Sequence, residues 1–172
     1  AWAGDFNPRS TTVLTAVFDA SFRDFRPTTT EGWFYELNLL ERIEGLEHLN
    51  TSQVTSMGWM FKGCGSLTSL DLSSFDTSKV TDMEEMFSGC ESLTALDLSS
   101  FDTSEVSYMR GMFSGCKSLT TIYCNSSWSD RLSDDMFSGC NSLRGAATNV
   151  GNSYDVSMAN PETGYFTKKV LS

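Results

Sequence analysis

The chain contains 172 residues, of which 40% are hydrophobic and 20% charged, and it carries a formal net charge of −10 at pH 7. This length suits one ordinary domain or one short array of repeats. The 12 Lys and Arg residues form no cluster, so the sequence lacks the basic patch with which proteins bind nucleic acids or anionic membranes. Within these 172 residues we expect neither a signal sequence nor a membrane span, because no apolar run is long enough to cross a membrane.

The predicted elements follow a repeating phrase, Met-Phe-x-Gly-Cys, whose copies begin at Met60, Met86, Met112 and Met136. A repeat of about 26 residues is typical of a solenoid, in which successive units stack on one another. Each unit opens with an apolar phrase, and these phrases begin at residues 14, 40, 67, 93, 119 and 143. The outer copies are degenerate, as expected for units that must face solvent.

These copies divide the chain into three parts of a single structural domain. Residues 1–39 are predicted to form an N-terminal cap that contains a degenerate repeat. Residues 40–147 hold the leucine-rich repeats, and residues 148–172 form a C-terminal cap. In this last part, the Asn160-Pro161 turn precedes a short apolar run around Tyr165, which predicts a final closing strand.

The clearest repeat spans residues 67–91. Its first part alternates apolar and polar residues around Leu70 and Leu72, which predicts a strand with one buried face. A polar turn follows at Asp76, and the next apolar residues recur at helical spacing: Val80, Met83, Phe87 and Cys90.

This second half of the repeat is predicted to be a short helix. Thr81 and Glu84 have the spacing of a capping box at its start, and Gly89 stands where a left-handed residue would end it. The expected fold is therefore an α/β leucine-rich-repeat-like solenoid. Its parallel sheet forms one face and its short helices the other.

Four of the five cysteines occupy the same position of the repeat, and Cys124 replaces a core leucine. Cysteines stacked in one column at the spacing of neighbouring strands, about 4.8 Å, are too far apart for an unstrained disulfide. We therefore expect all five to be free thiols that pack in the core.

The phrase "MFKGCGSLTSLDLSSFDTSKVTDMEEMFSGCESLTALDLSSFDTSEV" and the later "GYFT" resemble the BspA-like leucine-rich repeat surface proteins of host-associated bacteria. The resemblance implies a secreted or cell-surface protein, often lipid-anchored or part of a longer polypeptide. Some members of that family bind host extracellular-matrix or plasma proteins such as fibronectin and fibrinogen. The chain departs from the pattern in a shortened unit at residues 124–147, where Asn125 stands at the position of Ser73 and Ser99 in the regular copies.

The repeat alignment also predicts which side chains face outward from the strands. The middle row contains three carboxylates flanked by two aromatic residues: Phe18, Glu44, Asp71, Asp97 and Tyr123. Carboxylates about 4.8 Å apart repel one another. Our hypothesis is that this acidic row binds a basic partner surface or a cation. The alternative is that serines and water solvate it and that it only keeps the sheet soluble.

Two tryptophans allow more than one interpretation. Trp59 is expected either to pack into the gap above Gly32 of the preceding repeat or to form an exposed contact. Trp128 lies in an irregular Ser-rich stretch, as a loop anchor or a contact residue.

We do not expect an enzyme. The single histidine, His48, excludes a metal site built on several histidines and leaves one residue for any catalytic triad. No cofactor or metal is expected, and the chain is predicted to be a monomer. The predicted function is a non-enzymatic adhesion or protein-binding module that engages a host protein through its strand-lined face. The alternatives are a structural spacer with no ligand and a glycan-binding surface domain.

Overall fold

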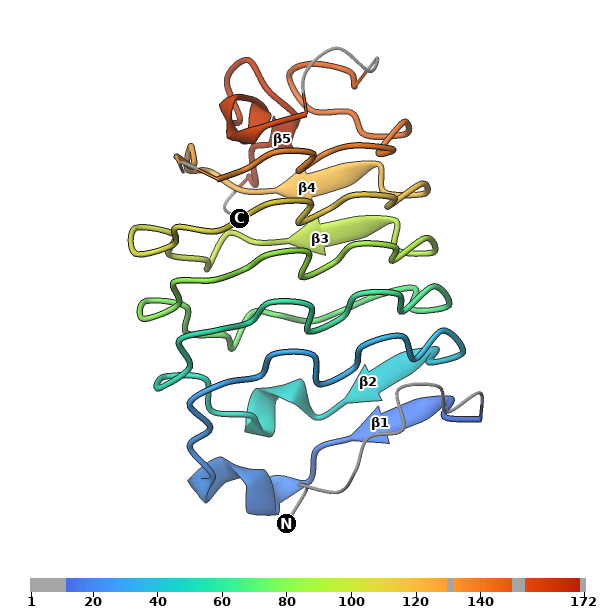
Figure 1. Ribbon diagram of the computed structural model, residues 1–172, viewed down its shortest axis with the longest axis vertical. Helices are drawn as coiled ribbons and strands as arrows, with labels where there is room; N and C mark the ends of the chain where they lie inside the picture. The colour runs from blue at the N-terminus through green and yellow to red at the C-terminus, as the bar shows by residue number, and fades with distance from the viewer. Residues whose placement is uncertain (1–11, 130–131, 150–153, 171–172) are drawn as a thin grey trace.

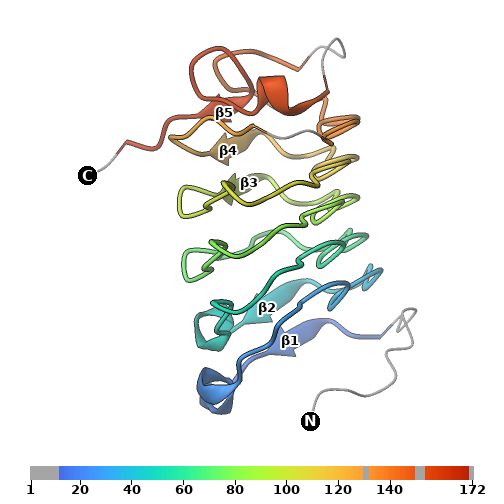
Figure 2. The same cartoon turned by 60° about the vertical axis from the view of Figure 1, so that its left-hand side comes forward.

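The computed structural model describes residues 12–129, 132–149 and 154–170 (Figure 1). The chain winds into coils that stack along the long axis, from the N-terminal end to the C-terminal end (Figures 1 and 2). The strands are β1 (Thr15–Val17), β2 (Arg42–Glu44), β3 (Ala95–Asp97), β4 (Thr121–Tyr123) and β5 (Phe166–Thr167). Within the described ranges, the helical elements are short 3-10 turns: η1 (Ala20–Asp24), η2 (Leu46–His48) and η3 (Val156–Met158).

The strands form two small parallel sheets along one side of the coils. One sheet joins β1 to β2, and the other has the order β3-β4-β5. Leu96 lies opposite Ile122, which lies opposite Phe166, so equivalent apolar residues meet across successive coils. The segment around Leu70 in the most regular repeat adds no strand to either sheet. The parallel sheet and the closing strand are thus confirmed, but the sheet is interrupted.

The predicted helices on the other side of the coils are absent from the described residues, and that part of the prediction is wrong. The backbone there bonds to the next coil: the Phe61 amide donates to the Met86 carbonyl at 2.9 Å, and the Phe87 amide to the Met112 carbonyl at 2.9 Å. Parallel bridges also link Ser56 to Asp82. An amide used in this way cannot close the i→i−4 bond of an α-helix.

Left-handed residues explain why no helix can form in this half of the repeat. One position of each coil has φ between 48° and 63°, in Gly32, Trp59, Glu85, Gly111 and Asp135. A second position, four residues later, has φ of 77° at Gly63 and 72° at Gly89. The sequence predicts the left-handed conformation of Gly89 correctly. Tight turns of this kind also point every third or fourth residue inward, which imitates the apolar spacing of a helix.

The capping box is also wrong. The Glu84 amide donates to Asp82 Oδ1 at 2.8 Å, whereas Thr81 Oγ1 donates to the Thr55 carbonyl of the preceding coil at 3.2 Å. Asp82 therefore closes a local turn, as Asp side chains commonly do, and Thr81 joins two coils.

A column of stacked phenylalanines forms the centre of the core. Neighbouring ring centroids lie 5.5–5.7 Å apart with interplanar angles of 2–9°, in the order Phe34, Phe61, Phe87, Phe113 and Phe137. Phe18 and Tyr165 contact the two ends of the column edge-on. These contacts change the ring orientation where the stack ends, and they cover its outermost faces.

The cysteines form a second column beside the phenylalanines. All five are free and buried, as predicted. Each thiol in the repeating position donates to the Phe carbonyl of the preceding coil. Cys90 Sγ lies 3.1 Å from the Phe61 oxygen, and Cys116 Sγ lies 3.1 Å from the Phe87 oxygen. The Phe61 oxygen also accepts from the Cys64 amide at 3.1 Å, so the thiol adds a second hydrogen bond to a buried carbonyl.

We expect the thiols to be unreactive in the folded chain. Burial raises the pKa of the Cys64 thiol to about 12, so the reactive thiolate is scarce at pH 8. Titration with a chromogenic disulfide should therefore detect almost no thiol in native protein and all five in concentrated guanidinium chloride. Rapid labelling of a Cys64→Ser variant, but not of the unsubstituted chain, would instead reveal local opening caused by the substitution. Rapid native labelling of the unsubstituted chain would contradict the prediction.

The two tryptophans differ in their surroundings. Trp128 is 5% exposed and its ring stacks on Phe101 and Phe113, so it anchors the irregular stretch to the core. Trp59 is 38% exposed. Gly32 and Trp59 occupy the same repeat position, and both have left-handed backbones.

Buried threonines hold the Asp-containing turn in two successive repeats. The Asp76 amide donates to Thr51 Oγ1 at 2.8 Å, and Thr51 Oγ1 donates to the Asp76 carbonyl at 3.0 Å. Thr77 makes the same pair of bonds with Asp102 of the next coil. The Asp-Thr-Ser phrase therefore connects successive coils at this edge. In the part of the chain that the structure describes, no helix is long and apolar enough to cross a membrane.

Candidate functional site: the strand-lined face

Two of the residues predicted for the middle outward row lie side by side on adjacent strands. Asp97 is paired in register with Tyr123. Glu44, at the end of β2, and Asp71 are both exposed. Tyr123 is 36% exposed. The row therefore presents the carboxylates of Glu44 and Asp71 and the ring of Tyr123 to solvent.

Phe18 does not belong to this row, which corrects the prediction. Val17 is the residue opposite Glu44, and Phe18 is 5% exposed within the core. The alignment of the first, degenerate repeat is wrong by one residue, and a shift of one residue exchanges the two faces of a strand. Leu14, which begins the first apolar phrase, is 50% exposed, and Val17 is 62% exposed.

Each carboxylate of the row has a partner within the chain. Arg42 Nε lies 2.7 Å from Glu44 Oε1, and Lys169 Nζ lies 2.5 Å from Asp97 Oδ2. Asp71 Oδ1 accepts from the Ser73 amide at 3.0 Å and from its hydroxyl at 2.6 Å. The charges of the row are therefore partly compensated within the chain, which the sequence pattern does not indicate.

Hydrogen bonding outweighs the repulsion between these carboxylates. The hydroxyl and amide of Ser73 lower the pKa of Asp71 below its ordinary value, although the charge of Asp97 acts in the opposite direction. Burial raises the pKa of Asp97, but Lys169 and Ser99 together lower it further than burial raises it. Both groups are consequently ionised at neutral pH.

The same carboxylate–serine turn occurs at the next bend of the coil. Asp76 Oδ1 accepts from the Ser78 amide at 3.0 Å, and Asp102 Oδ1 accepts from the Ser104 amide at 2.9 Å. These bonds lower the pKa of Asp76 and Asp102 too. The bond to a serine two residues later is thus a structural device of the repeat and does not distinguish the strand face.

These turns predict that the chain loses stability in acid. A carboxyl group with a lowered pKa in the folded state stabilises that state above the unfolded pKa, and this stabilisation is lost as the pH falls through the folded value. Because the ordinary value is 3.8, the midpoint of thermal unfolding should fall from about pH 5 downward and continue to fall below pH 3.8. An Asp76→Asn, Asp102→Asn variant should show a shallower fall, and an unchanged slope would contradict the assignment.

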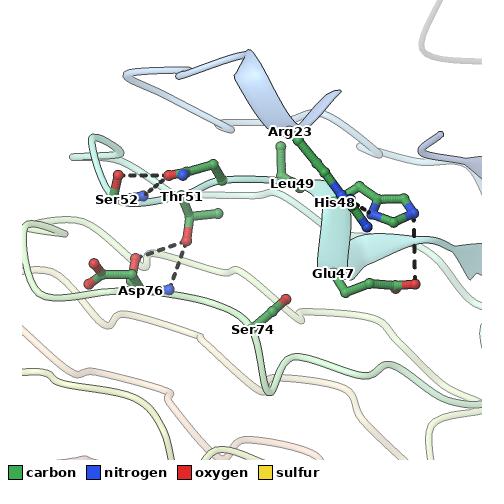
Figure 3. Close-up of a pocket in the computed structure, with 9 residues that line it drawn as sticks. Arg23, Glu47, His48, Leu49, Thr51, Ser52, Ser74 and Asp76 are labelled. Atoms are coloured by element: carbon green, nitrogen blue, oxygen red, sulfur yellow. Dashed lines mark hydrogen bonds and ion pairs between the residues drawn. The ribbon is translucent and has the colours of Figure 1, made fainter. Parts of the chain in front are cut away.

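A polar cavity of about 370 Å³ lies at the edge of the first coils, next to η2 (Figure 3). Its lining is Arg23, Glu47, His48, Leu49, Asn50, Thr51, Ser52, Ser74 and Asp76. Arg23 Nε donates to His48 Nδ1 at 3.3 Å, and His48 Nε2 lies 4.0 Å from Glu47 Oε1 (Figure 3). The sequence pattern did not predict this cavity around His48. A separation of about one repeat between Arg23 and His48 was the available indication.

Two further features of the described residues bear on the chemistry of this face. No group of three or more His, Cys, Asp or Glu side chains among them could hold a metal ion. Lys169 reaches Asp97 from a position 72 residues later in the chain, and nothing in the repeat pattern indicates that contact.

Comparisons with known proteins relate the chain to bacterial repeat proteins. It is similar to a leucine-rich cell surface protein of Faecalibacterium prausnitzii A2-165, with 23% identity and a TM-score of 0.36, over 65% of this chain and 34% of that one. It is also similar to a leucine-rich repeat protein of Bacteroides ovatus ATCC 8483, with 24% identity and a TM-score of 0.47, over 97% of this chain and 45% of that one. The chain thus spans less than half the length of either protein.

No curated protein shows significant sequence similarity to the chain. A family model does match, over residues 28–152, which include the phenylalanine column, the cysteine column and the carboxylate row. The chain therefore belongs to the family described as "Mycoplasma protein of unknown function, DUF285".

Proposed function

We propose that the chain is a non-enzymatic protein-binding module of a cell-surface or secreted protein, and that it engages its ligand through the strand-lined face. The observation that carries the proposal is that Glu44, Asp71 and Tyr123 are exposed and that the half-buried Asp97 is paired in register with Tyr123. The resemblance of its repeats to BspA-like surface proteins supports the location and the ligand class, a host extracellular-matrix or plasma protein.

The composition of the row suits a protein ligand. Tyrosine is enriched at the centres of protein interfaces because it offers apolar area with a polar tip. The carboxylates beside Tyr123 are ionised and held in fixed geometry by Ser73 and Ser99. Charges held in this way attract a partner of opposite charge without further ordering.

The partner should carry a basic surface. The chain has a net charge of −10, and association between surfaces of opposite charge is accelerated at low ionic strength and slowed by salt. Asp71 makes no ion pair with a basic side chain among the described residues. It is therefore the carboxylate of the row that is best placed to receive a charge from the partner.

A binding screen with a matched charge control tests the proposal. Immobilised fibronectin and fibrinogen are suitable first probes, at low and high salt. The Asp71→Asn, Asp97→Asn variant should bind about tenfold more weakly at low salt. The Asp76→Asn, Asp102→Asn variant is the control. It removes the same number of charges, also from aspartates that accept from the serine two residues later, and it should bind as the unsubstituted chain does.

The other outcomes identify the alternatives. Equal losses in both variants would show that net charge alone drives binding, and no loss in either would exclude the row. Failure to bind any matrix or plasma protein would favour a structural spacer.

The polar cavity beside η2 is the observation that favours a glycan as the second candidate ligand (Figure 3). Glycan binding at this place should be lost in an Arg23→Gln, Glu47→Gln variant, which preserves the net charge, and retained in the Asp71→Asn, Asp97→Asn variant.

A further inference from the structure

The segment after β5 is bound to the strand-lined face by one residue, Lys169. Its amide donates to Asn125 Oδ1 at 2.7 Å, and its carbonyl accepts from Asn125 Nδ2 at 3.3 Å. Its Nζ lies 2.5 Å from Asp97 Oδ2. Figure 1 shows this segment descending from β5 past the end of β4.

Asn125 contacts the main chain of Lys169, whereas Asp97 contacts its side chain. An asparagine side chain that pairs with both the N–H and the C=O of one residue holds an extended segment whatever that residue is. The carboxylate of Asp97 then selects a positive charge. The Cys124 amide donates to the Thr167 carbonyl at 3.1 Å, so Asn125 continues a parallel ladder where the backbone pairing ends. Addition of a strand to a sheet with selective side-chain contacts is a recurrent mode of peptide recognition.

Lys169 is held by exposed groups only. The side chains of Lys169 and Asp97 are 46% and 43% exposed, and an exposed ion pair contributes little to stability. Lys168 points its charge elsewhere, to Glu162 Oε1 at 2.6 Å. The interaction of Lys169 with the face is therefore specific in its geometry but weak enough for another segment to replace it.

We propose that Asp97 and Asn125 form a binding site for an extended, lysine-containing peptide segment, and that Lys169 occupies this site as an intramolecular competitor. The inference rests on the proposed function and narrows it. The partner contributes an extended basic segment, and binding requires the chain to release Lys169. The asparagine that departs from the repeat pattern at position 125 is then the residue that recognises the peptide backbone.

The test uses the full chain and a synthetic peptide, KKVLS, which has the sequence of residues 168–172. Binding is followed by the NMR resonances of the Asn125 side-chain amide and, in the variant that lacks this side chain, of the Tyr123 backbone amide. Lys169→Pro removes both the competing amide and the competing charge, so the peptide should bind about tenfold more tightly than to the unsubstituted chain. Lys168→Pro is the matched control and should give no gain. Lys169→Ala, which keeps the backbone contact, should give an intermediate gain.

Two further variants test specificity. A KAVLS peptide should bind Lys169→Pro at least about tenfold more weakly than KKVLS, and Asn125→Ala in that variant should abolish binding of both. Equal affinity of KKVLS for the Lys169→Pro and Lys168→Pro variants, or equal affinity of the two peptides, would overturn the proposal. So would the absence of peptide binding to every variant.

The outcome separates this inference from the proposed function. If fibronectin or fibrinogen binds through Asp71 and Asp97 with the same affinity in Lys169→Pro as in the unsubstituted chain, the proposed function holds and the competitor role of Lys169 is refuted. If the peptide binds as expected but no matrix or plasma protein does, the inference holds and the proposed ligand class is wrong.

Discussion

Replacing Phe87 by alanine is expected to lower the free energy of unfolding by about 3–5 kcal/mol. Phe87 is fully buried, and its ring stacks on both Phe61 and Phe113 at 5.7 Å. The substitution therefore leaves a cavity with aromatic rings on two sides, and the coils above and below cannot close it without breaking their own backbone bonds. Urea unfolding followed by circular dichroism measures the loss.

The position of Phe87 in the stack also affects cooperativity. Each coil of a repeat array contacts only its neighbours, so a weak coil in the middle separates two more stable parts. We expect the unfolding transition of Phe87→Ala to broaden. Phe25→Ala is the control because that ring is 50% exposed, and its effect should stay within about 0.5 kcal/mol. Similar losses of unfolding free energy in the two variants would show that the phenylalanine column contributes no more to stability than an exposed ring.

Gly145→Ala is expected to destabilise the C-terminal end of the chain by about 3 kcal/mol, the upper part of the range for overpacking. A Cβ atom at Gly145 would lie 2.3 Å from the Tyr165 carbonyl carbon and 2.6 Å from the Phe166 oxygen. Both atoms belong to the backbone, so β5 itself must move. Because Ile122 pairs with Phe166, this movement separates β5 from β4.

The readout for Gly145→Ala is local as well as global. Hydrogen exchange at the Phe166 and Thr167 amides should accelerate, whereas exchange in the coils around Phe87 should not. Gly65→Ala is the matched control, since a Cβ there would meet its nearest atoms at 4.0 Å and its backbone is not left-handed. A neutral result for Gly145→Ala would mean that the closing strand tolerates a shift and does not hold the end of the stack.

The loss of β5 would also test the proposed peptide site. Lys169 is the second residue after β5, so Gly145→Ala should weaken its contacts with Asn125 and Asp97. Peptide binding to Gly145→Ala should increase if Asn125 stays in place, in the same direction as in Lys169→Pro.

Much of the candidate site could be predicted from the repeat alignment. It places Asp97 and Tyr123 beside each other because both belong to regular copies, whose register is set by the apolar residues between them. It fails for Phe18 because the first copy has apolar residues at adjacent positions, such as Val17 and Phe18, so two alignments one residue apart both fit the pattern. It cannot find Lys169, which has no counterpart in the other repeats and reaches Asp97 only through the closing strand.

The predicted helices show a different limit. An inward-facing residue at every third or fourth position satisfies the helical pattern, but Gly32, Gly63, Gly89, Gly111 and Gly115 all have left-handed backbones. A glycine at one position of a repeat reads equally as a helix cap or as part of a tight turn. Trp59 and Glu85 occupy the same repeat position as Gly32 and Gly111. They hide the need for a left-handed backbone there, because residues other than glycine rarely adopt a positive φ.

The sequence by itself determined the repeat, the buried thiols and the identity of the core columns, because periodic apolar residues must meet once the units stack. The tertiary structure alone decided the path of the backbone between those columns. Bonds between coils replace bonds within a helix there, since a buried amide must find an acceptor and the next coil supplies one at 2.7–2.9 Å, as for Gly89 and Phe87. It also decided that the charge of Asp97 is already paired, because its contact with Lys169 joins residues 72 positions apart and no local pattern contains it.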